Sequence, residues 1–339
     1  MAMGNVLDVF NNDVFGMVSM TTAINKLPEQ PSKLGDMGLF KQVPINTLIA
    51  VVEERQGRLS LVQSSARGTR SVEQPHAKRK VRSFQVPHLQ EDDEVLADSI
   101  QGLRDFENSD NLTAIATVVN QRLESMKNNI DATREWHRCG ALQGVIYEAD
   151  TTTVIYDLYA EFGLTQDTQA FDFSYTSPTV DVKTASTKVR RKIEHAIGAT
   201  PFTGIMAICG DDFWDAFISA KTVKEAFLNW TAAGQFLTKT QRQGFEFADI
   251  TWMNYSSKIG STFYINPSYC YFIPMGAPDL FVEFVSPADY IETVNQLGRP
   301  YYAKQKVKDF DKGIDLQAQS NVLNMCQRPG VIIKGTFTT

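Results

Sequence analysis

The chain has 339 residues, 43% of them hydrophobic and 21% charged, so it can bury a sizeable core, and its length suggests two domains. Its formal net charge of −6 argues against a protein built to grip nucleic acid, which needs an excess of basic residues on one face. No basic stretch followed by an apolar segment occurs at the N-terminus, so we expect neither a secretion signal nor a membrane span.

Residues 1–45 predict an N-terminal arm. A short helix is expected at Ser19–Asn25, and proline and glycine recur in the segment that follows it. This composition favours an extended chain with little core of its own.

Residues 46–86 predict a long two-stranded loop. Two runs rich in Val, Ile and Leu flank Arg55, Gln56 and Gly57, which is a hairpin signature. The rest of the segment has too few apolar residues for a separate core. Because a hairpin of this length is marginally stable alone, we expect it to lie on another surface.

Two oppositely charged strips follow one another along the chain. Residues 53–82 carry eight basic and three acidic residues, and residues 91–110 carry eight acidic residues and one basic residue. One interpretation is that the loop of one copy docks on the acidic strip of a neighbouring copy, since charge complementarity sets partner and register. The alternative is that both strips are solvated or pair within one chain. The candidate contact residues are Arg67, Arg70, Lys78, Arg79, Lys80, Arg82, Glu91, Asp92, Asp93 and Glu94.

A single long helix is predicted from Asp110 to about Arg138, with Gly140 and Gly144 as stop signals. Its apolar residues step by three and four, which places them on one stripe: Leu112, Ile115, Val119, Leu123, Met126 and Ile130. The residues between them predict a polar outer face: Gln121, Glu124, Lys127, Asn128, Asp131, Arg134 and Glu135. A helix from 110 to about 138 spans roughly 42 Å, which suits a strut.

The chain after the helix predicts an α+β arrangement, because its helices and strands come in blocks rather than in regular alternation. A hairpin is expected around Ala149-Asp150-Thr151, an amphipathic helix at Thr184–Ile197 and a helix capped by Asp211. The expected strands are Gly204–Cys209, Phe245–Trp252, Ser261–Ile265, Tyr269–Pro274, Leu280–Val285 and several long strands from Arg299 onward.

The sequence predicts no catalytic residue, no cofactor and no metal site. Cys139, Cys209, Cys270 and Cys326 are widely spaced and form no CxxC pair, so we expect buried reduced thiols rather than zinc ligands. His137 is two residues from Cys139, and residues two apart on a helix point away from each other. The four carboxylates of 91–94, in an apparent loop, favour a solvated surface over a cation site. Nucleotide-binding and hydrolase motifs are missing from the sequence.

The order of these parts resembles the major capsid protein of tailed bacteriophages, in the branch of the lambda head protein. Three segments carry the resemblance: EERQGRLSLVQSSARGTR, KRKVRSFQVPHLQEDDEVLADSIQGLRDF and REWHRCGALQGVIYEADTTTVIYDLYAEFG. The resemblance implies an α+β capsid fold of the Hong Kong phage type. Its implied parts are an N-terminal arm (1–45), an extended loop (46–86), a peripheral domain (87–150 and 296–325) with a spine helix (110–143), and an axial domain (151–295 and 326–339).

The resemblance also implies a function. Copies of the chain are expected to form hexamers and pentamers of an icosahedral shell that encloses double-stranded DNA without reading its sequence. The shell would be assembled in the host cytoplasm and retained in the virion, with portal, scaffold and decoration proteins as candidate partners and no membrane. The alternatives are a cellular nanocompartment shell of the encapsulin type and a soluble hydrolase with an unrecognised site.

Overall fold

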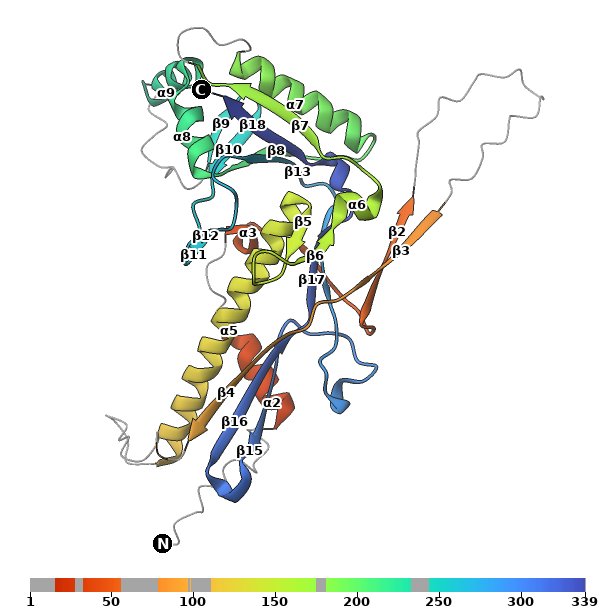
Figure 1. Cartoon of the computed structure of the whole chain (residues 1–339), viewed down its shortest axis with the longest axis vertical. Helices are drawn as coiled ribbons and strands as arrows, with labels where there is room; N and C mark the ends of the chain where they lie inside the picture. The colour runs from red at the N-terminus through yellow and green to blue at the C-terminus, as the bar shows by residue number, and fades with distance from the viewer. Residues whose placement is uncertain are drawn as a thin grey trace, which may run out of the picture.

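The computed structural model describes residues 16–27, 33–55, 79–96, 98, 111–174, 181–232 and 244–338. Figure 1 shows an elongated molecule. A six-stranded sheet with helices forms one end, a three-stranded sheet beside a long helix forms the other, and a hairpin projects from the side.

The long helix α5 (Asn111–Gln143) is the axis of the elongated part. It confirms the predicted helix and continues past about Arg138, to the end that the resemblance implied for the spine helix. Val119, Leu123, Met126 and Ile130 are buried, as their spacing predicted. The helix ends at Gly144, whose φ of +87° suits glycine and whose site would place a Cβ 2.1 Å from the ring of Tyr159.

The buried stripe of α5 packs on an antiparallel sheet. Its strands are β15 (Tyr302–Val307), β16 (Gly313–Ser320) and β4 (Leu89–Leu96), in that order. Val95, Ile314 and Leu316 join the stripe in one apolar cluster. Helix α2 (Met17–Lys26) adds Met20 and Ile24 to this cluster, so the described part of the N-terminal arm packs on the body of the molecule.

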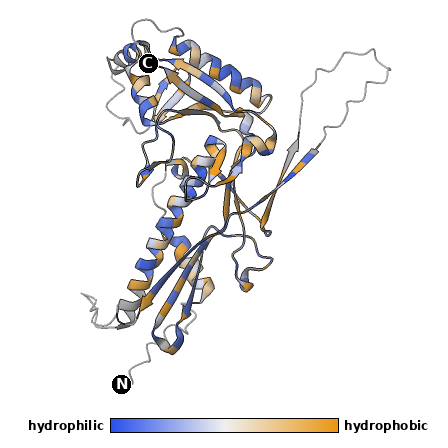
Figure 2. Ribbon diagram, in the orientation of Figure 1, coloured by the Kyte–Doolittle hydropathy of each residue, from blue (hydrophilic) through white to orange (hydrophobic). Residues whose placement is uncertain are grey.

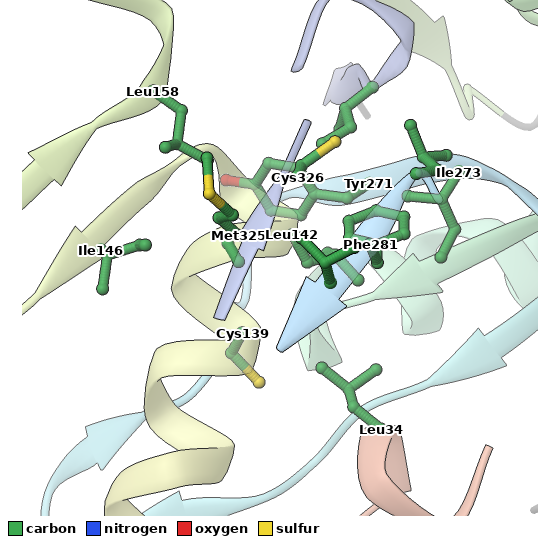
Figure 3. Packing of buried hydrophobic residues seen from close by; sticks show 14 of the residues in the cluster. Leu34, Cys139, Leu142, Ile146, Leu158, Tyr271, Ile273, Phe281, Met325 and Cys326 are labelled. Carbon is green, nitrogen blue, oxygen red and sulfur yellow. The ribbon is translucent and has the colours of Figure 1, made fainter. Parts of the chain in front are cut away.

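A second sheet lies where α5 meets the six-stranded end. Strand β1 (Lys41–Pro44) pairs in parallel with β14 (Phe281–Val285), which pairs in antiparallel fashion with β17 (Val322–Cys326). Phe281–Val285, which we expected in the axial domain, therefore lies outside the six-stranded sheet. Figure 3 shows the apolar core at this junction, where Leu142, Met325 and Phe281 meet.

The six-stranded sheet has the order β7, β18, β13, β8, β10, β9. Its strands are β7 (Asp167–Asp172), β8 (Gly204–Cys209), β9 (Phe245–Phe247), β10 (Ile250–Asn254), β13 (Cys270–Met275) and β18 (Ile333–Thr338). The helices are α7 (Val182–Ile197), α8 (Asp211–Ser219) and α9 (Lys221–Ala232). An aromatic core fills this part, with the rings of Phe217 and Trp252 stacked 4.1 Å apart. The predicted cap was wrong, because Gly210 is the N-cap of α8 and the Asp211 carboxylate accepts from Ser256 Oγ at 3.2 Å.

Shorter elements complete the described fold. They are α3 (Lys33–Asp36), β2 (Ile49–Arg55), β3 (Arg79–Gln85), β5 (Val145–Tyr147), β6 (Val154–Asp157), α6 (Leu158–Phe162), β11 (Lys258–Ile259), β12 (Thr262–Phe263), η4 (Ile291–Thr293), η5 (Asp309–Asp311) and η6 (Pro329–Val331). The hairpin predicted around Asp150 is confirmed, because its carboxylate accepts from the backbone N–H groups of Thr152 at 2.9 Å and Thr153 at 2.8 Å. All four cysteines are buried and free, as predicted.

Candidate subunit interfaces

The projecting hairpin is formed by β2 and β3, which pair in antiparallel register from Ile49 opposite Gln85 to Arg55 opposite Arg79. The sequence predicted a turn at residues 55–57, with β2 paired to the run that follows directly. That pairing was wrong, because the partner of β2 is the more distant segment 79–85. Residues 56–78, which connect the two strands, lie outside the described residues.

The hairpin has two different faces. Ala50, Val52 and Phe84 are buried, and the ring of Phe84 lies 5.4 Å from that of Tyr156 on β6. The side chains of Ile49, Val51 and Val81 are 48%, 57% and 63% exposed. The first set of residues anchors the hairpin on the molecule, and the second set, here called the outer apolar face, is open to solvent.

The basic residues of the hairpin divide into two groups. Arg82 makes contacts within its own chain. Its guanidinium donates to the carbonyls of Glu161 and Phe162 and lies 4.8 Å from the ring centroid of Phe162. Lys80 is exposed at the hydrophilic outer end of β3 (Figure 2). The predicted residues Arg67, Arg70 and Lys78 lie outside the described residues, as does the side chain of Arg79.

The acidic residues Glu91–Glu94 lie on strand β4, and the prediction of a loop was wrong. Consecutive carboxylates have low strand propensity, but β16 supplies a full ladder of pairs along this segment. Alternation along the strand sends Glu91 and Asp93 toward α5, where Asn129 Nδ2 donates to Glu91 Oε1 at 2.7 Å and Arg122 lies 3.6 Å from Asp93.

Asp92 and Glu94 lie on the opposite face of β4. Gln317 Nε2 donates to Asp92 Oδ1 at 2.8 Å, and the Lys308 ammonium contacts the carboxylate of Glu94. A hollow of about 740 Å³ lies over this face, and its lining includes carboxylates of β4 and β16 and the amines of Lys304 and Lys306 on β15. All four carboxylates of 91–94 thus have partners within the chain.

Where α5 packs beside the β1–β14–β17 sheet, it carries a network of buried charged residues that the sequence did not predict. Lys127, Asp131, Arg134 and Glu135 were expected on a polar outer face, yet each is at most 7% exposed. The reason is that α5 is enclosed on several sides, by the β15–β16–β4 sheet, α2, α3 and β17. The clue in the sequence was the alternation of opposite charges, which leaves the face neutral and allows its burial as ion pairs.

Glu283 on β14 is the centre of this network. Its Oε1 lies 2.6 Å from Arg134 Nη2 and its Oε2 lies 3.0 Å from Arg138 Nη2, while Gln42 Nε2 donates to Oε1 at 3.0 Å. Burial raises the pKa of Glu283, but the two guanidinium groups outweigh burial and leave its pKa below the ordinary value. Glu283 therefore stays ionised and ties α5 to β14 and β1.

Glu135 extends the network to the arm and to the six-stranded part. Its Oε1 accepts from the backbone N–H of Leu34 at 2.8 Å and from Tyr255 Oη at 2.7 Å. Lys127 Nζ donates to the carbonyl of Leu27 at 2.6 Å. Segments from four parts of the sequence are thus held on one helix, so the network fixes the geometry of the junction.

Nothing in this region supports a nucleophile. Burial lowers the pKa of His137 to about 4, so its imidazole is neutral near pH 7. Burial also raises the pKa of the Cys139 thiol well above its usual range, which disfavours the reactive thiolate. The described residues contain no group of three or more His, Cys, Asp or Glu side chains placed to hold a metal, and no described helix is long and apolar enough to cross a membrane.

Comparison with known proteins identifies the family of this chain and its relatives. The family described as phage major capsid protein E matches residues 16–337. The chain is 26% identical to the major capsid protein of Pseudomonas phage KPP10, over 95% of this chain and 96% of the relative. It is 24% identical to the major capsid protein of Salmonella phage Felix O1, over 94% and 95% of the two chains.

Among solved structures, the putative capsid protein of a prophage of E. coli CFT073 has the same fold, with a TM-score of 0.59 and 13% identity over 95% of this chain and 99% of that one. The predicted capsid fold is therefore confirmed. The match of the family to nearly the whole chain decides the assignment: the chain belongs to the phage major capsid protein E family.

Proposed function

We propose that copies of this chain assemble into hexamers and pentamers that close an icosahedral shell around the packaged double-stranded DNA of a tailed phage. The chain is a major capsid protein, a structural component of the virion and not an enzyme, by its family. The observation that carries the assembly proposal is the outer apolar face of the β2–β3 hairpin, which projects from the body with Val51 57% exposed and Val81 63% exposed. Such a ribbon gains stability when a neighbouring subunit covers it.

The charged strips would fix how the β2–β3 hairpin of one subunit aligns on its neighbour. Asp92 and Glu94 contact Gln317 and Lys308 of their own chain but are exposed beside the hollow, whereas Glu91 and Asp93 are only partly exposed against α5. The acidic acceptor proposed on the neighbour is therefore the face of β4 that carries Asp92 and Glu94. Lys80 on β3 is the described basic donor, and Arg67, Arg70, Lys78 and Arg79 extend it as proposed contacts. Electrostatic complementarity of this kind fixes partner and orientation more than affinity.

The proposed division of the subunit follows the resemblance, with one change. The arm (1–45), extended loop (46–86), peripheral parts and axial domain stand as proposed above. The pairing of β14 with β1 and β17 favours assigning residues 281–285 to the junction rather than to the axial domain. Portal, scaffold and decoration proteins, and assembly in the host cytoplasm, complete the proposal. The net charge of −6 suits a wall that does not adhere to packed DNA.

The alternative of a nanocompartment shell predicts a different content. Particles purified from infected cells should contain phage DNA under our proposal and a protein cargo under the alternative. The alternative of a soluble hydrolase predicts no assembly, and the family to which the chain belongs is structural.

The outer apolar face can be tested by paired substitutions. Val51→Ser with Val81→Ser should leave the subunit folded by circular dichroism but strongly reduce closed shells in electron micrographs, because both side chains are exposed in the free subunit. Val154→Ser on β6 is the control, because it makes the same substitution at another exposed valine (48% exposed) outside the outer apolar face. This variant should assemble normally. Normal shells from the double variant would contradict the proposed role of this face.

The charged strips can be tested by reversal and rescue. Changing Lys78, Arg79 and Lys80 to Glu should impair assembly of a folded subunit, and adding Asp92→Lys and Glu94→Lys should partly restore it. Lys188→Glu on α7, an exposed lysine in the described part of the chain, is the control. If the triple reversal assembles normally, the docking of the strips is wrong even if the shell itself forms.

A further inference from the structure

Two large hydrophobic side chains are far more exposed than any others in the described part of the chain. Ile291 is 91% exposed and Phe310 is 90% exposed, whereas Leu48, at 65%, is the next of the described large hydrophobic residues. Ile291 lies in η4, between β14 and β15, Phe310 lies in η5, between β15 and β16, and neither belongs to the aromatic core of the six-stranded sheet. Single exposed hydrophobic residues are ordinary, so the surroundings of each decide whether it has a use.

Phe310 is presented at the tip of the turn between β15 and β16. Its backbone has φ 61° and ψ 24°, a left-handed conformation that an aromatic residue rarely adopts. The base of the turn is fixed, because the Lys308 N–H donates to the Gly313 carbonyl at 2.9 Å and Lys308 Nζ lies 3.2 Å from Asp315. The ring is therefore held away from the body by a rigid base.

The segment around η4 carries the second apolar feature. Ile291, Val294 and Leu297 are 91%, 64% and 63% exposed and recur every three residues. The segment is anchored, since Thr293 Oγ1 donates to the Ala288 carbonyl at 2.7 Å and the Gly298 N–H donates to the Ile45 carbonyl at 2.9 Å. These three side chains, here called the η4 patch, thus form a preformed apolar surface rather than a loose loop.

Exposed charged residues flank both features. Asp289 and Arg299 are exposed at the two ends of the η4 patch, and Asp309 and Lys312 are exposed on the two sides of Phe310. No ion pair joins any of these four to another described residue; the Lys312 ammonium lies 5.6 Å from the ring centroid of Phe310. Each feature therefore offers an acid and a base to a partner, besides Glu292, which pairs with Lys304, and Asp311, whose side chain lies outside the described residues.

We propose that Phe310 of one copy packs on the η4 patch of a second copy, with Asp309 facing Arg299 and Lys312 facing Asp289. The two features are both open to solvent within one chain, so their contact requires two copies. Such a contact joins different surfaces of identical subunits and can therefore close a ring of copies. The inference rests on the proposed shell but concerns a surface separate from the β2–β3 hairpin.

A charge exchange tests the pairing directly. Asp309→Arg should reduce the yield of closed shells by roughly tenfold or more, because like charges would meet across the contact. Arg299→Asp should do the same, and the double variant with both changes should recover most of the yield. Phe310→Ala should also reduce the yield, while Ile218→Ala, at a site 45% exposed on α8, should not. Circular dichroism of each subunit separates assembly from folding.

Cysteine cross-linking identifies the partner surface. The four native cysteines are buried, so under mild oxidation the Phe310→Cys, Val294→Cys double variant should give covalent multimers that neither single variant gives. Multimers from the Phe310→Cys variant alone would mean that the tips meet each other, which overturns the proposal. If the wild type forms no shells, the proposed function fails; if it forms shells and the charge variants assemble equally well, only this inference fails.

Discussion

The six-stranded end of the subunit and the junction around α5 are both buried, but different chemistry fills them. Phe171, Phe213, Phe217, Trp252 and Phe272 pack ring against ring in the first. The junction buries Arg134, Arg138, Glu135 and Glu283 as ion pairs and hydrogen bonds. Apolar packing tolerates changes of similar volume, whereas ion pairs are directional. Because its contacts are directional, the ionic junction should set the angle between the two ends of the subunit.

The largest expected effect comes from removing Glu283. Glu283→Ala would leave Arg134 and Arg138 buried with one acceptor fewer, which should lower the free energy of unfolding by about 3–5 kcal/mol. Urea unfolding of the isolated subunit measures this loss. A loss below about 1 kcal/mol would mean that the junction is not held by its ions.

Phe217→Ala is the matched change in the aromatic core. Loss of a fully buried ring stacked on Trp252 should cost about 3–5 kcal/mol, but this cost should hardly vary with pH. The cost of Glu283→Ala should shrink in acid instead. Glu283 has a folded pKa below its ordinary value of 4.5, so the stability it contributes is present above pH 4.5 and is lost as the pH falls through the folded pKa. If the stability losses of the two variants depended on pH in the same way, the ionic junction and the aromatic core would not differ as proposed.

His137 should give the junction a second pH dependence. Burial lowers its pKa from 6.5 to about 4, so the unfolded chain binds this proton more tightly than the folded one. The corresponding stability is complete above pH 6.5 and falls between pH 6.5 and 4, by roughly 3 kcal/mol at about 1.4 kcal/mol per pH unit. Unfolding curves of His137→Leu should show a flatter profile in this window, and an unchanged slope would contradict the assignment.

Tyr255→Phe should have a smaller effect. It removes one hydrogen bond to the Glu135 carboxylate, which keeps the Leu34 N–H and Arg138 as partners. We expect a loss of about 1.5–3 kcal/mol in urea unfolding. A loss as large as that of Glu283→Ala would place the centre of the network at Glu135 instead.

A substitution on the exposed polar face of α5 should have the smallest effect on the free energy of unfolding. Glu124 is exposed, so Glu124→Ala should change the unfolding free energy by less than about 0.5 kcal/mol. Leu123→Asp, one residue away at a site 2% exposed, is the destabilising contrast and should cost several kcal/mol. A Glu124→Ala subunit that folds but does not assemble would show that this part of the helix also contacts a neighbour.

The sequence predicted the elements whose pattern is set locally. The apolar stripe of α5, the amphipathic α7 and strand β8 all followed from periodicity or apolar runs. Strand β4 escaped prediction because its pairing with β16 depends on residues more than two hundred positions away. The partners in β1 and β14 are likewise more than two hundred positions apart. Local propensity carries no information about such partners.

The candidate site was predicted less completely, for a physical reason. The signs of the charged residues were enough to predict the two strips. The sequence does not reveal that Arg82 would bind the carbonyls of α6 or that Asp93 would pair with Arg122. Burial of Arg134 depends on how many elements surround α5, which periodicity does not report. Exposure of Phe310 and Ile291 likewise depends on the tertiary fold.

The central claim is that this chain builds a closed shell, and electron microscopy of the purified wild-type protein tests it most directly. Together with sedimentation velocity, it should reveal closed particles, or rings of subunits that convert to them when the scaffold protein is added. A protein that stays monomeric at every concentration, with and without scaffold, would contradict the account.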